Sequence, residues 1–318
     1  MKFGVPVGNF GAFGSDPGIE GCLEVARGAE ELGFDSIWVH DHVIIPERIV
    51  ARYPYNATGD FAVTAEAEIY EPLVMMSALA AITKRVRIGV SVLVIPYRHP
   101  AVTAKMLATA DLLSGGRITL GAGVGWMRDE FEALGLPPEH FEHRGSVTSE
   151  YLAAMKEMWT NTGPSNFTGR FVQFHDVGTF PKPMQPHIPI VIGGKGEAAW
   201  RRASRLGDGF QAIAVTPEQL RGEVEQLRAI CALDRRDPDE LEISLLGGMR
   251  FTEQPEGAER APLTGSVEQI AEDLRAFGKA GLDHLIATPV MAAGQGPLER
   301  IVGGMELAAA ELLPAFAG

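Results

Sequence analysis

The stretch DSIWVHDHVIIP, residues 35–46, combines an apolar strand with an abrupt polar end. It begins as a short apolar run, places His40, Asp41 and His42 side by side, and then returns to apolar residues. Three neighbouring titratable side chains are costly to bury unless they find partners. The stretch therefore predicts a buried strand whose carboxyl end carries either a functional site or an ordinary polar rim.

The same strand pattern recurs along the whole chain, in alternation with amphipathic helical segments. Eight runs fit it: residues 2–8, 35–40, 86–95, 117–123, 188–194, 209–215, 241–248 and 283–290. Most are apolar without strict alternation, which is typical of parallel strands buried on both faces. Repeated strand–helix units with eight strands favour an α/β fold. We expect a (β/α)8 TIM barrel formed by residues 1–318 as a single domain, rather than two doubly wound domains.

Two connections are too long to be simple turns and are expected to be insertions in the barrel. Residues 43–70 follow the second predicted strand and so leave from the catalytic face of a barrel. Their aromatic residues Tyr53, Tyr55 and Phe61 suggest the lining of a pocket. Residues 160–187 precede the fifth strand, so we expect much of this insertion to pass the opposite face.

Composition restricts the partners of the protein. The formal net charge of −13 argues against duplex nucleic acid, which requires a basic face. With only Cys22 and Cys231, no disulfide framework is indicated. The first residues, MKFGVPVGNFG, lack the continuous apolar core of a signal peptide, and no run is long enough to span a membrane. We therefore expect a cytoplasmic protein that acts on a small molecule.

One interpretation of the polar triplet is a metal site. His40 and His42 should share one side of the strand, and a His-x-His pair on a barrel strand resembles the first metal signature of amidohydrolases. The other ligands of that family are missing, because the fifth strand ends in Gly193 and Gly194 and Asp283 stands at the start of the eighth strand. A metal hydrolase is thus an alternative, but we predict no metal.

Glycines follow two further strands. The run GAGVGW, residues 121–126, is not a dinucleotide fingerprint, because Trp126 occupies the position of the third glycine. Gly121, Gly123 and Gly125 instead allow close approach of backbone or ligand, or simply tight barrel packing.

Gly193, Gly194 and Lys195 precede a predicted helix, an arrangement that offers backbone N–H groups and a positive charge to an anion. A plain glycine-rich turn is the alternative.

The run GVSVLVIPYRHP, residues 89–100, places Ser91 inside an apolar strand and Arg98 after its end. Arg98 is positioned either to meet an anionic substrate or to pair with a surface carboxylate.

Taken in order, these stretches resemble the bacterial-luciferase-like flavin barrel superfamily, the luciferase-like monooxygenases, and within it the branch that uses the deazaflavin coenzyme F420. The resemblance runs nearly end to end and is carried by GAEELGFDSIWVHDH (28–42), by residues 72–135, by RGSVTSEYLAAMKEMW (144–159) and by IPIVIGGKGEAAWRRASRLGDGF (188–210). The Asp-His pair after the second strand favours the F420 branch, because members that use FMN more often have a Glu-His-His type of ending there.

The resemblance implies a role for each motif. Asp41 and His42 would lie beside the ring system as the catalytic pair, with His42 as proton donor or acceptor. Ser91–Val92 matches the position of a non-prolyl cis peptide that supports the ring in relatives. The other implied cofactor contacts are Gly123 and Gly125 near the ring, and Gly193, Gly194 and Lys195 at the phosphate.

One departure from the family bears on the substrate. Relatives that oxidise sugar phosphates have a catalytic glutamate where this chain has Trp126, so we expect Trp126 to wall the substrate pocket, with Tyr53 and Arg98 as weaker candidates. Glu130, four residues on, is either an acid or, as we expect, a solvent-exposed residue at a helix start.

The resulting prediction is an F420-dependent oxidoreductase that transfers hydride between the deazaflavin and a small organic substrate, and that forms a homodimer. The alternatives are an FMN-dependent monooxygenase, a metal hydrolase and a non-catalytic flavin-binding protein.

Overall fold

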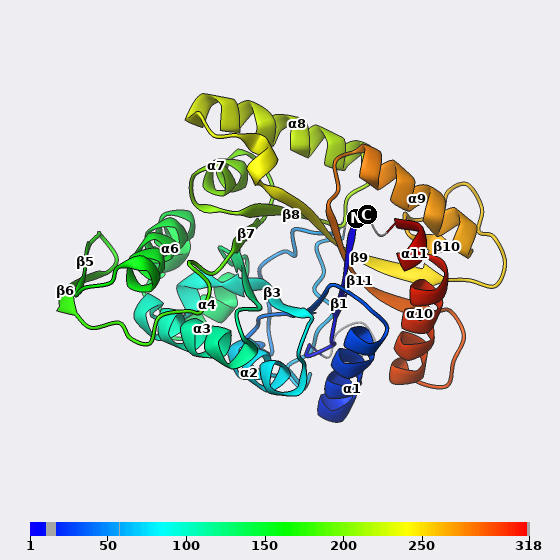
Figure 1. The fold of residues 1–318 in the computed structure, drawn as a ribbon, viewed down its shortest axis with the longest axis horizontal. Helices are drawn as coiled ribbons and strands as arrows, with labels where there is room; N and C mark the ends of the chain where they lie inside the picture. Colours follow the sequence, from blue (N-terminus) through cyan, green and yellow to red (C-terminus); the bar gives the residue numbers. More distant parts are fainter. Residues whose placement is uncertain (11–16, 57, 317–318) are drawn as a thin grey trace.

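Eight parallel strands form a closed barrel in the computed structural model, which describes residues 1–10, 17–56 and 58–316 (Figure 1). Strand β9 pairs with both β8 and β11, and β11 pairs with β1, so the ring of eight strands closes. The predicted (β/α)8 fold is therefore confirmed. The barrel strands are β1 (Lys2–Pro6), β2 (Ser36–Val39), β3 (Arg87–Val94), β4 (Ile118–Gly123), β7 (Ile190–Gly193), β8 (Gly209–Ile213), β9 (Glu242–Phe251) and β11 (His284–Met291).

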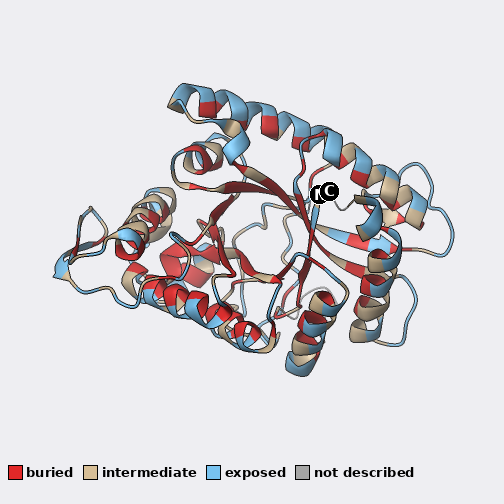
Figure 2. Cartoon of the chain, viewed as in Figure 1, coloured by how far each residue is buried: buried red, intermediate tan, exposed pale blue. Residues whose placement is uncertain are grey.

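Eight helices surround the barrel, buried on their inward faces and exposed outward (Figure 2). Prolines open several of them, and α8 and α9 begin with reciprocal capping boxes at Thr216 and Ser266. These helices are α1 (Gly18–Glu31), α2 (Pro72–Ile82), α3 (Pro100–Ser114), α6 (Arg144–Thr160), α7 (Glu197–Leu206), α8 (Pro217–Asp234), α9 (Val267–Lys279) and α10 (Pro297–Glu311). Shorter additions are η1 (Ile95–Tyr97), α4 (Arg128–Ala133), α5 (Pro138–Glu142), η2 (Pro238–Glu240), β10 (Thr264–Gly265) and α11 (Leu313–Phe316).

Trp38 fills the amino-terminal end of the barrel interior. A Cβ atom at Gly4 would lie 2.7 Å from its Nε1, and one at Gly89 would lie 2.3 Å from its ring, so both neighbouring strands need glycine there. The indole N–H donates to the Ser36 hydroxyl, which in turn contacts His284 at 2.9 Å. Trp38, Ser36 and His284 thus pack together at this end of the barrel, whereas the predicted site residues 40–42 follow the carboxyl end of β2.

The two long insertions differ. Within the described part of residues 43–70, no helix or strand longer than a single bridge forms before α2. Residues 160–187 contain an antiparallel hairpin, β5 (Ser165–Thr168) and β6 (Gln173–Val177), which projects beside α6 (Figure 1). A pocket of about 210 Å³ lies between this hairpin, α3 and α6, outside the barrel. It shares no residue with the predicted site.

No helix within residues 1–10, 17–56 and 58–316 combines the length and apolarity needed to cross a membrane.

Candidate active site

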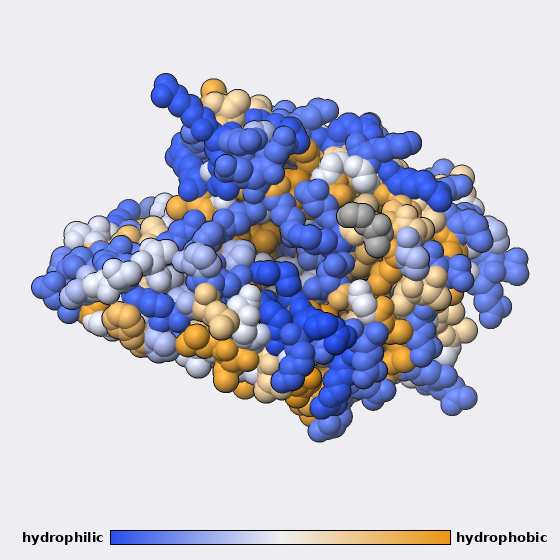
Figure 3. Space-filling model, viewed as in Figure 1, coloured by the Kyte–Doolittle hydropathy of each residue, from blue (hydrophilic) through white to orange (hydrophobic). Residues whose placement is uncertain are grey.

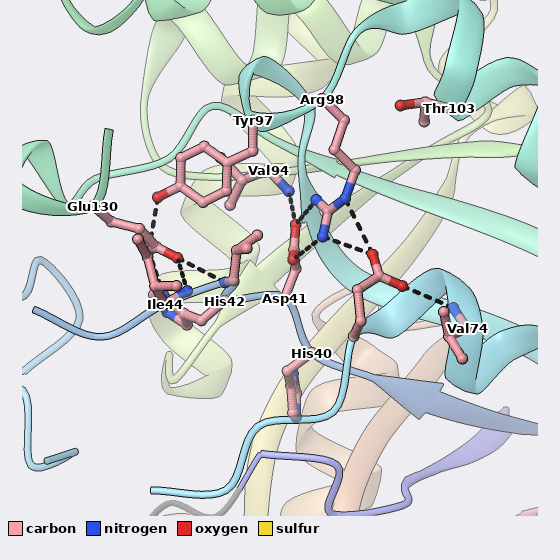
Figure 4. Close-up of polar contacts among 12 residues, drawn as sticks. His40, Asp41, His42, Ile44, Val74, Val94, Tyr97, Arg98, Thr103 and Glu130 are labelled. Carbon is pink, nitrogen blue, oxygen red and sulfur yellow. Dashed lines mark hydrogen bonds and ion pairs between the residues drawn. The ribbon is translucent and has the colours of Figure 1, made fainter. Parts of the chain in front are cut away.

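The three polar residues that follow β2 turn to three different partners, and Figure 4 shows two of them, Arg98 and Glu130. Strand β2 ends at Val39, so the alternation that would place His40 and His42 together no longer applies. The His40 Nδ1 donates to the Ser91 carbonyl at 2.7 Å, Asp41 pairs with Arg98, and the His42 Nδ1 lies 2.6 Å from Glu130. The imidazoles of His40 and His42 thus bind different partners. Among the described residues, no group of three or more His, Cys, Asp or Glu side chains could hold a metal ion.

Asp41 is a buried structural anchor. Its side chain is fully buried and accepts two hydrogen bonds of 2.8 Å from the Arg98 guanidinium and one of 2.8 Å from the Val94 N–H. Burial raises the pKa of Asp41, and the hydrogen bonds and charge of Arg98 oppose this effect. Arg98 also binds Glu71 at 2.8 Å. Of the two interpretations of Arg98, the structure shows pairing with carboxylates, one of which, Asp41, is buried rather than on the surface.

His40 holds the next strand in place. Burial lowers the pKa of His40, although its bond to Ser91 opposes the shift. Because a carbonyl only accepts, the proton of the ring lies on Nδ1. His40 thus ties the end of β2 to Ser91, while Asp41 ties it to Val94.

Glu130 is buried, which corrects the prediction of an exposed residue. It is 0% exposed and accepts four hydrogen bonds, from His42 Nδ1, from the Tyr97 hydroxyl at 2.8 Å, and from the Val43 and Ile44 N–H groups at 2.8 and 3.3 Å. Burial and the charge of Glu130 raise the pKa of Tyr97, so the phenol remains a donor. The sequence held a signal for this burial. Met127, Phe131 and Leu134 mark the inward face of this segment, and Glu130 falls on it.

Aromatic rings enclose His42. The imidazole stacks on Phe10 with 5.2 Å between centroids, lies 5.2 Å from Phe61, and meets Trp126 edge-on at 6.4 Å. Tyr53 lies 5.2 Å from Trp126, so these two predicted pocket residues do come together, whereas sequence reasoning missed Phe10. The first insertion therefore contributes apolar walls directly over His42.

The predicted cis peptide between Ser91 and Val92 is present, at a bulge in β3. The Ser91 hydroxyl donates to the Gln211 Oε1 at 2.5 Å, and the Gln211 Nε2 is buried without a partner. A Cβ atom at Gly123 would lie 2.3 Å from the Val92 side chain, and one at Gly193 would lie 2.7 Å from it. These glycines make room for the bulge.

Gly125 has a different packing role. Its φ of +77° favours glycine, and a Cβ atom there would lie 2.7 Å from Phe131. Gly121 is constrained by backbone, because a Cβ atom would lie 2.0 Å from the Val90 carbonyl oxygen. The protein's own packing thus accounts for both glycines.

The amino terminus of α7 offers an anion site. Gly194 and Gly196 have φ values of +133° and +81°, and no side chain caps the helix. Lys195 is exposed, with its Nζ 5.4 Å from the Tyr55 ring centroid. Burial raises the pKa of nearby Glu223, and the charge of Lys195 opposes this. Uncapped N–H groups and a lysine together suit a phosphate.

The closed barrel thus carries a histidine beyond β2, a bulge on β3, and a helix start at α7 without a side-chain cap beside Lys195. The family model for luciferase-like monooxygenase matches residues 1–262, and the chain belongs to this family. Its members are flavin- or deazaflavin-dependent oxidoreductases and monooxygenases, and this chain is an enzyme of that class.

Several relatives match about three fifths of the chain. An uncharacterized protein of Mycobacterium tuberculosis is 37% identical over 202 residues, which are 62% of this chain and 69% of that protein. The F420-dependent glucose-6-phosphate dehydrogenase of Amycolatopsis mediterranei is 36% identical over 189 residues, 59% of this chain and 51% of that enzyme. The FMNH2-dependent dimethylsulfone monooxygenase of Pseudomonas putida is 31% identical over 217 residues, which are 68% of this chain and 59% of that enzyme.

Solved structures share the fold at low identity. The monooxygenase RslO1 from Streptomyces bottropensis superposes with a TM-score of 0.79 at 22% identity, covering 100% of both chains. An F420-dependent secondary alcohol dehydrogenase, solved with an F420–acetone adduct, superposes with a TM-score of 0.77 at 19% identity. The superposition covers 100% of this chain and 99% of that enzyme.

Proposed function

We propose that this protein is a cytoplasmic F420-dependent oxidoreductase that transfers hydride between the deazaflavin and a small organic substrate. The observation that carries the proposal is that the segment of residues 40–42 is bonded to the β3 bulge through its first two residues. His40 and Asp41 tie the same three-residue segment to Ser91 and Val94, so an imidazole is held at the end of the barrel where the bulge occurs. The similarity to an F420-dependent dehydrogenase supports the choice of coenzyme.

The residues present fit such a coenzyme. Glycines at 123 and 193 place no side chain against Val92 at the bulge, and Gln211, whose Oε1 accepts from Ser91, keeps a buried Nε2 without a partner there. Ser91 and Val92 would support the ring, and Gly193, Gly194 and Lys195 would hold the phosphate. When bound, the deazaflavin supplies a hydride donor or acceptor.

The chain itself supplies proton transfer and a dry pocket. His42 is the acid or base, with Nε2 as the atom that exchanges the proton, because Nδ1 is bound to Glu130. Phe10, Phe61 and Trp126 exclude water around it. Trp126 replaces the glutamate of sugar-phosphate oxidisers, so we expect a substrate other than a sugar phosphate.

Fluorescence titration with F420 and with FMN tests the coenzyme. We expect saturable F420 binding at micromolar concentrations or below, and weaker FMN binding. Micromolar FMN binding without F420 binding would overturn the proposal.

An FMN-dependent monooxygenase is the second candidate, because the dimethylsulfone monooxygenase matches 68% of this chain. Oxygen consumption by the enzyme loaded with reduced coenzyme separates the two candidates. We expect none with reduced F420 beyond the uncatalysed rate, and a monooxygenase would consume oxygen with reduced FMN.

We also propose a homodimer that buries the outer face of α2 and α3. Apolar side chains gather along this face, at the lower edge of Figure 3, and Val74, Val102 and Leu113 are 61%, 56% and 58% exposed. Such a patch is unusual on a monomer. Light scattering should give twice the chain mass of 34.2 kDa, and the Val102→Asp variant should give the chain mass alone. A monomeric native protein would refute this association.

A further inference from the structure

A carboxylate stands directly behind the imidazole of His42. Glu130 lies on α4, and its side chain is 0% exposed while that of His42 is 12% exposed. Its Oε2 accepts from the His42 Nδ1 at 2.6 Å and from the Tyr97 hydroxyl at 2.8 Å. Its Oε1 accepts from the N–H groups of Val43 and Ile44. Both carboxylate oxygens of Glu130 therefore accept hydrogen bonds, and each of their four partners is a donor.

No lysine or arginine forms an ion pair with Glu130 among the described residues. The nearest guanidinium in this network, that of Arg98, is held by Asp41 and Glu71 instead (Figure 4). The imidazole of His42 is therefore the group on which the buried charge of Glu130 acts most directly. A charge-assisted hydrogen bond of this kind is stronger than one between neutral groups.

We infer that Glu130 is a positioning residue that fixes His42 in the Nδ1–H tautomer. The carboxylate can only accept, so the proton lies on Nδ1 and the lone pair on Nε2. Within the described residues nothing hydrogen-bonds to Nε2, and the imidazole centroid lies 5.2 Å from that of Phe10 and 5.2 Å from that of Phe61. When Nε2 takes one proton from a substrate, the resulting imidazolium is balanced by Glu130, and no proton passes to the carboxylate. This catalytic consequence rests on the proposed function, whereas the tautomer does not.

The substitution Glu130→Gln gives a sharp test because an amide has only one acceptor oxygen. The N–H groups of Val43 and Ile44 cannot change their role, so they keep that oxygen. The amide NH2 then faces His42, which can accept from it only if the Nδ1 proton is lost. The variant should therefore hold neutral His42 as the Nε2–H tautomer, the reverse of the native protein.

Asp129→Asn is the matched control. Asp129 accepts from the N–H groups of Val50 and Ala51 at 3.1 and 3.0 Å, so it ties the same insertion to α4 without touching His42. Loss of its charge should leave the tautomer of His42 as it is in the native protein. A change in both variants would indicate a general loosening of the insertion and would overturn the inference.

Nitrogen-15 NMR of protein labelled at its eight histidines reads the tautomer directly, with His42→Asn assigning the signal. We expect Nδ1–H in the native protein and Nε2–H in Glu130→Gln. An Nε2–H signal in the native protein, or the same signal in both, would overturn the inference. If Glu130→Gln does not fold, the native spectrum still decides, and Tyr97→Phe should keep Nδ1–H.

Steady-state kinetics test whether Glu130 contributes to catalysis. With coenzyme bound, Glu130→Gln should lower kcat by roughly 10²-fold with a much smaller change in KM, because general acid–base catalysis is lost while binding remains. An unchanged kcat would overturn the catalytic role. If native protein turns over with neither F420 nor FMN, the proposed function fails, but the tautomer result stands on its own.

Discussion

At the scale of single residues, adjacent side chains have separate tasks. His40 and Asp41 face into the protein and fasten the end of β2, while His42 is left beside the aromatic walls. His40 and Asp41 thus hold the backbone in place, whereas His42 has the proposed chemical role. The division can be tested one residue at a time.

His42→Ala should retain the fold and part of the coenzyme affinity but lose turnover by roughly 10²-fold or more, because the acid or base is gone. Steady-state kinetics and thermal melting of the same preparation measure both effects. His187→Asn, at a histidine whose side chain is 46% exposed, is the control and should behave as the native protein. Native turnover in His42→Ala would place proton transfer on another group.

Arg98→Met should lower the free energy of unfolding by about 3–5 kcal/mol, because it leaves the Asp41 carboxylate buried without its ionic partner. Urea unfolding followed by circular dichroism gives the value. Arg205→Met removes the comparable but exposed pair with Asp234 and should change stability little. Equal effects in the two variants would mean that burial of the Asp41–Arg98 pair contributes nothing.

At the scale of elements, the end of β2, the bulge of β3 and the start of α4 form one unit. Strand positions were predictable because parallel barrel strands are continuous apolar runs, and the eight predicted runs coincide with the eight barrel strands within a few residues. The hairpin β5–β6 was not predicted, because its half-exposed strands lack a clear period. The burial of Glu130 was mispredicted although neighbouring apolar residues marked its face of the segment as inward, because a buried carboxylate needs partners and those of Glu130, among them Tyr97, lie 33 or more residues away along the chain.

Gly123→Ala should weaken coenzyme binding at least about tenfold and lower stability, because the new Cβ would lie 2.3 Å from Val92 in the bulge. Fluorescence titration and melting measure the two effects, and adding Val92→Ala should restore much of the loss. Gly222→Ala is the control. Its Cβ meets nothing within 4 Å on α8, so it should stabilise the protein by about 0.5–1 kcal/mol without changing affinity. Native affinity in Gly123→Ala would show that the bulge does not contact the coenzyme.

At the scale of the whole molecule, charged residues close the barrel at the end opposite the site. Glu242 at the start of β9 contacts Lys2 of β1 and His284 of β11, and so links three strands. Burial acts to raise the pKa of Glu242, but hydrogen bonds from His284 and Lys2 lower it to about 2 from the usual 4.5. Closure of the barrel therefore depends in part on an ionised carboxylate.

This lowered pKa predicts a pH dependence of stability. The contribution of Glu242 is fully present above pH 4.5 and is lost as the pH falls toward 2, because the unfolded chain binds the proton more readily. Urea unfolding at several pH values in this window should show a shallower decline for Glu242→Gln than for the native protein. Identical pH slopes would mean that Glu242 does not contribute.

The anchoring of residues 40–44 also bears on how such an enzyme can diversify. These residues are fixed to β3, to Arg98 and to Glu130, and Glu71 is fixed again to Arg98. The chain between residues 45 and 70 is thus a cassette held at both ends, and it supplies Tyr53 and Phe61 to the aromatic cluster around His42. New sequences can be exchanged within this cassette while the imidazole and its carboxylate stay in place. Substrate range and proton chemistry can therefore evolve separately.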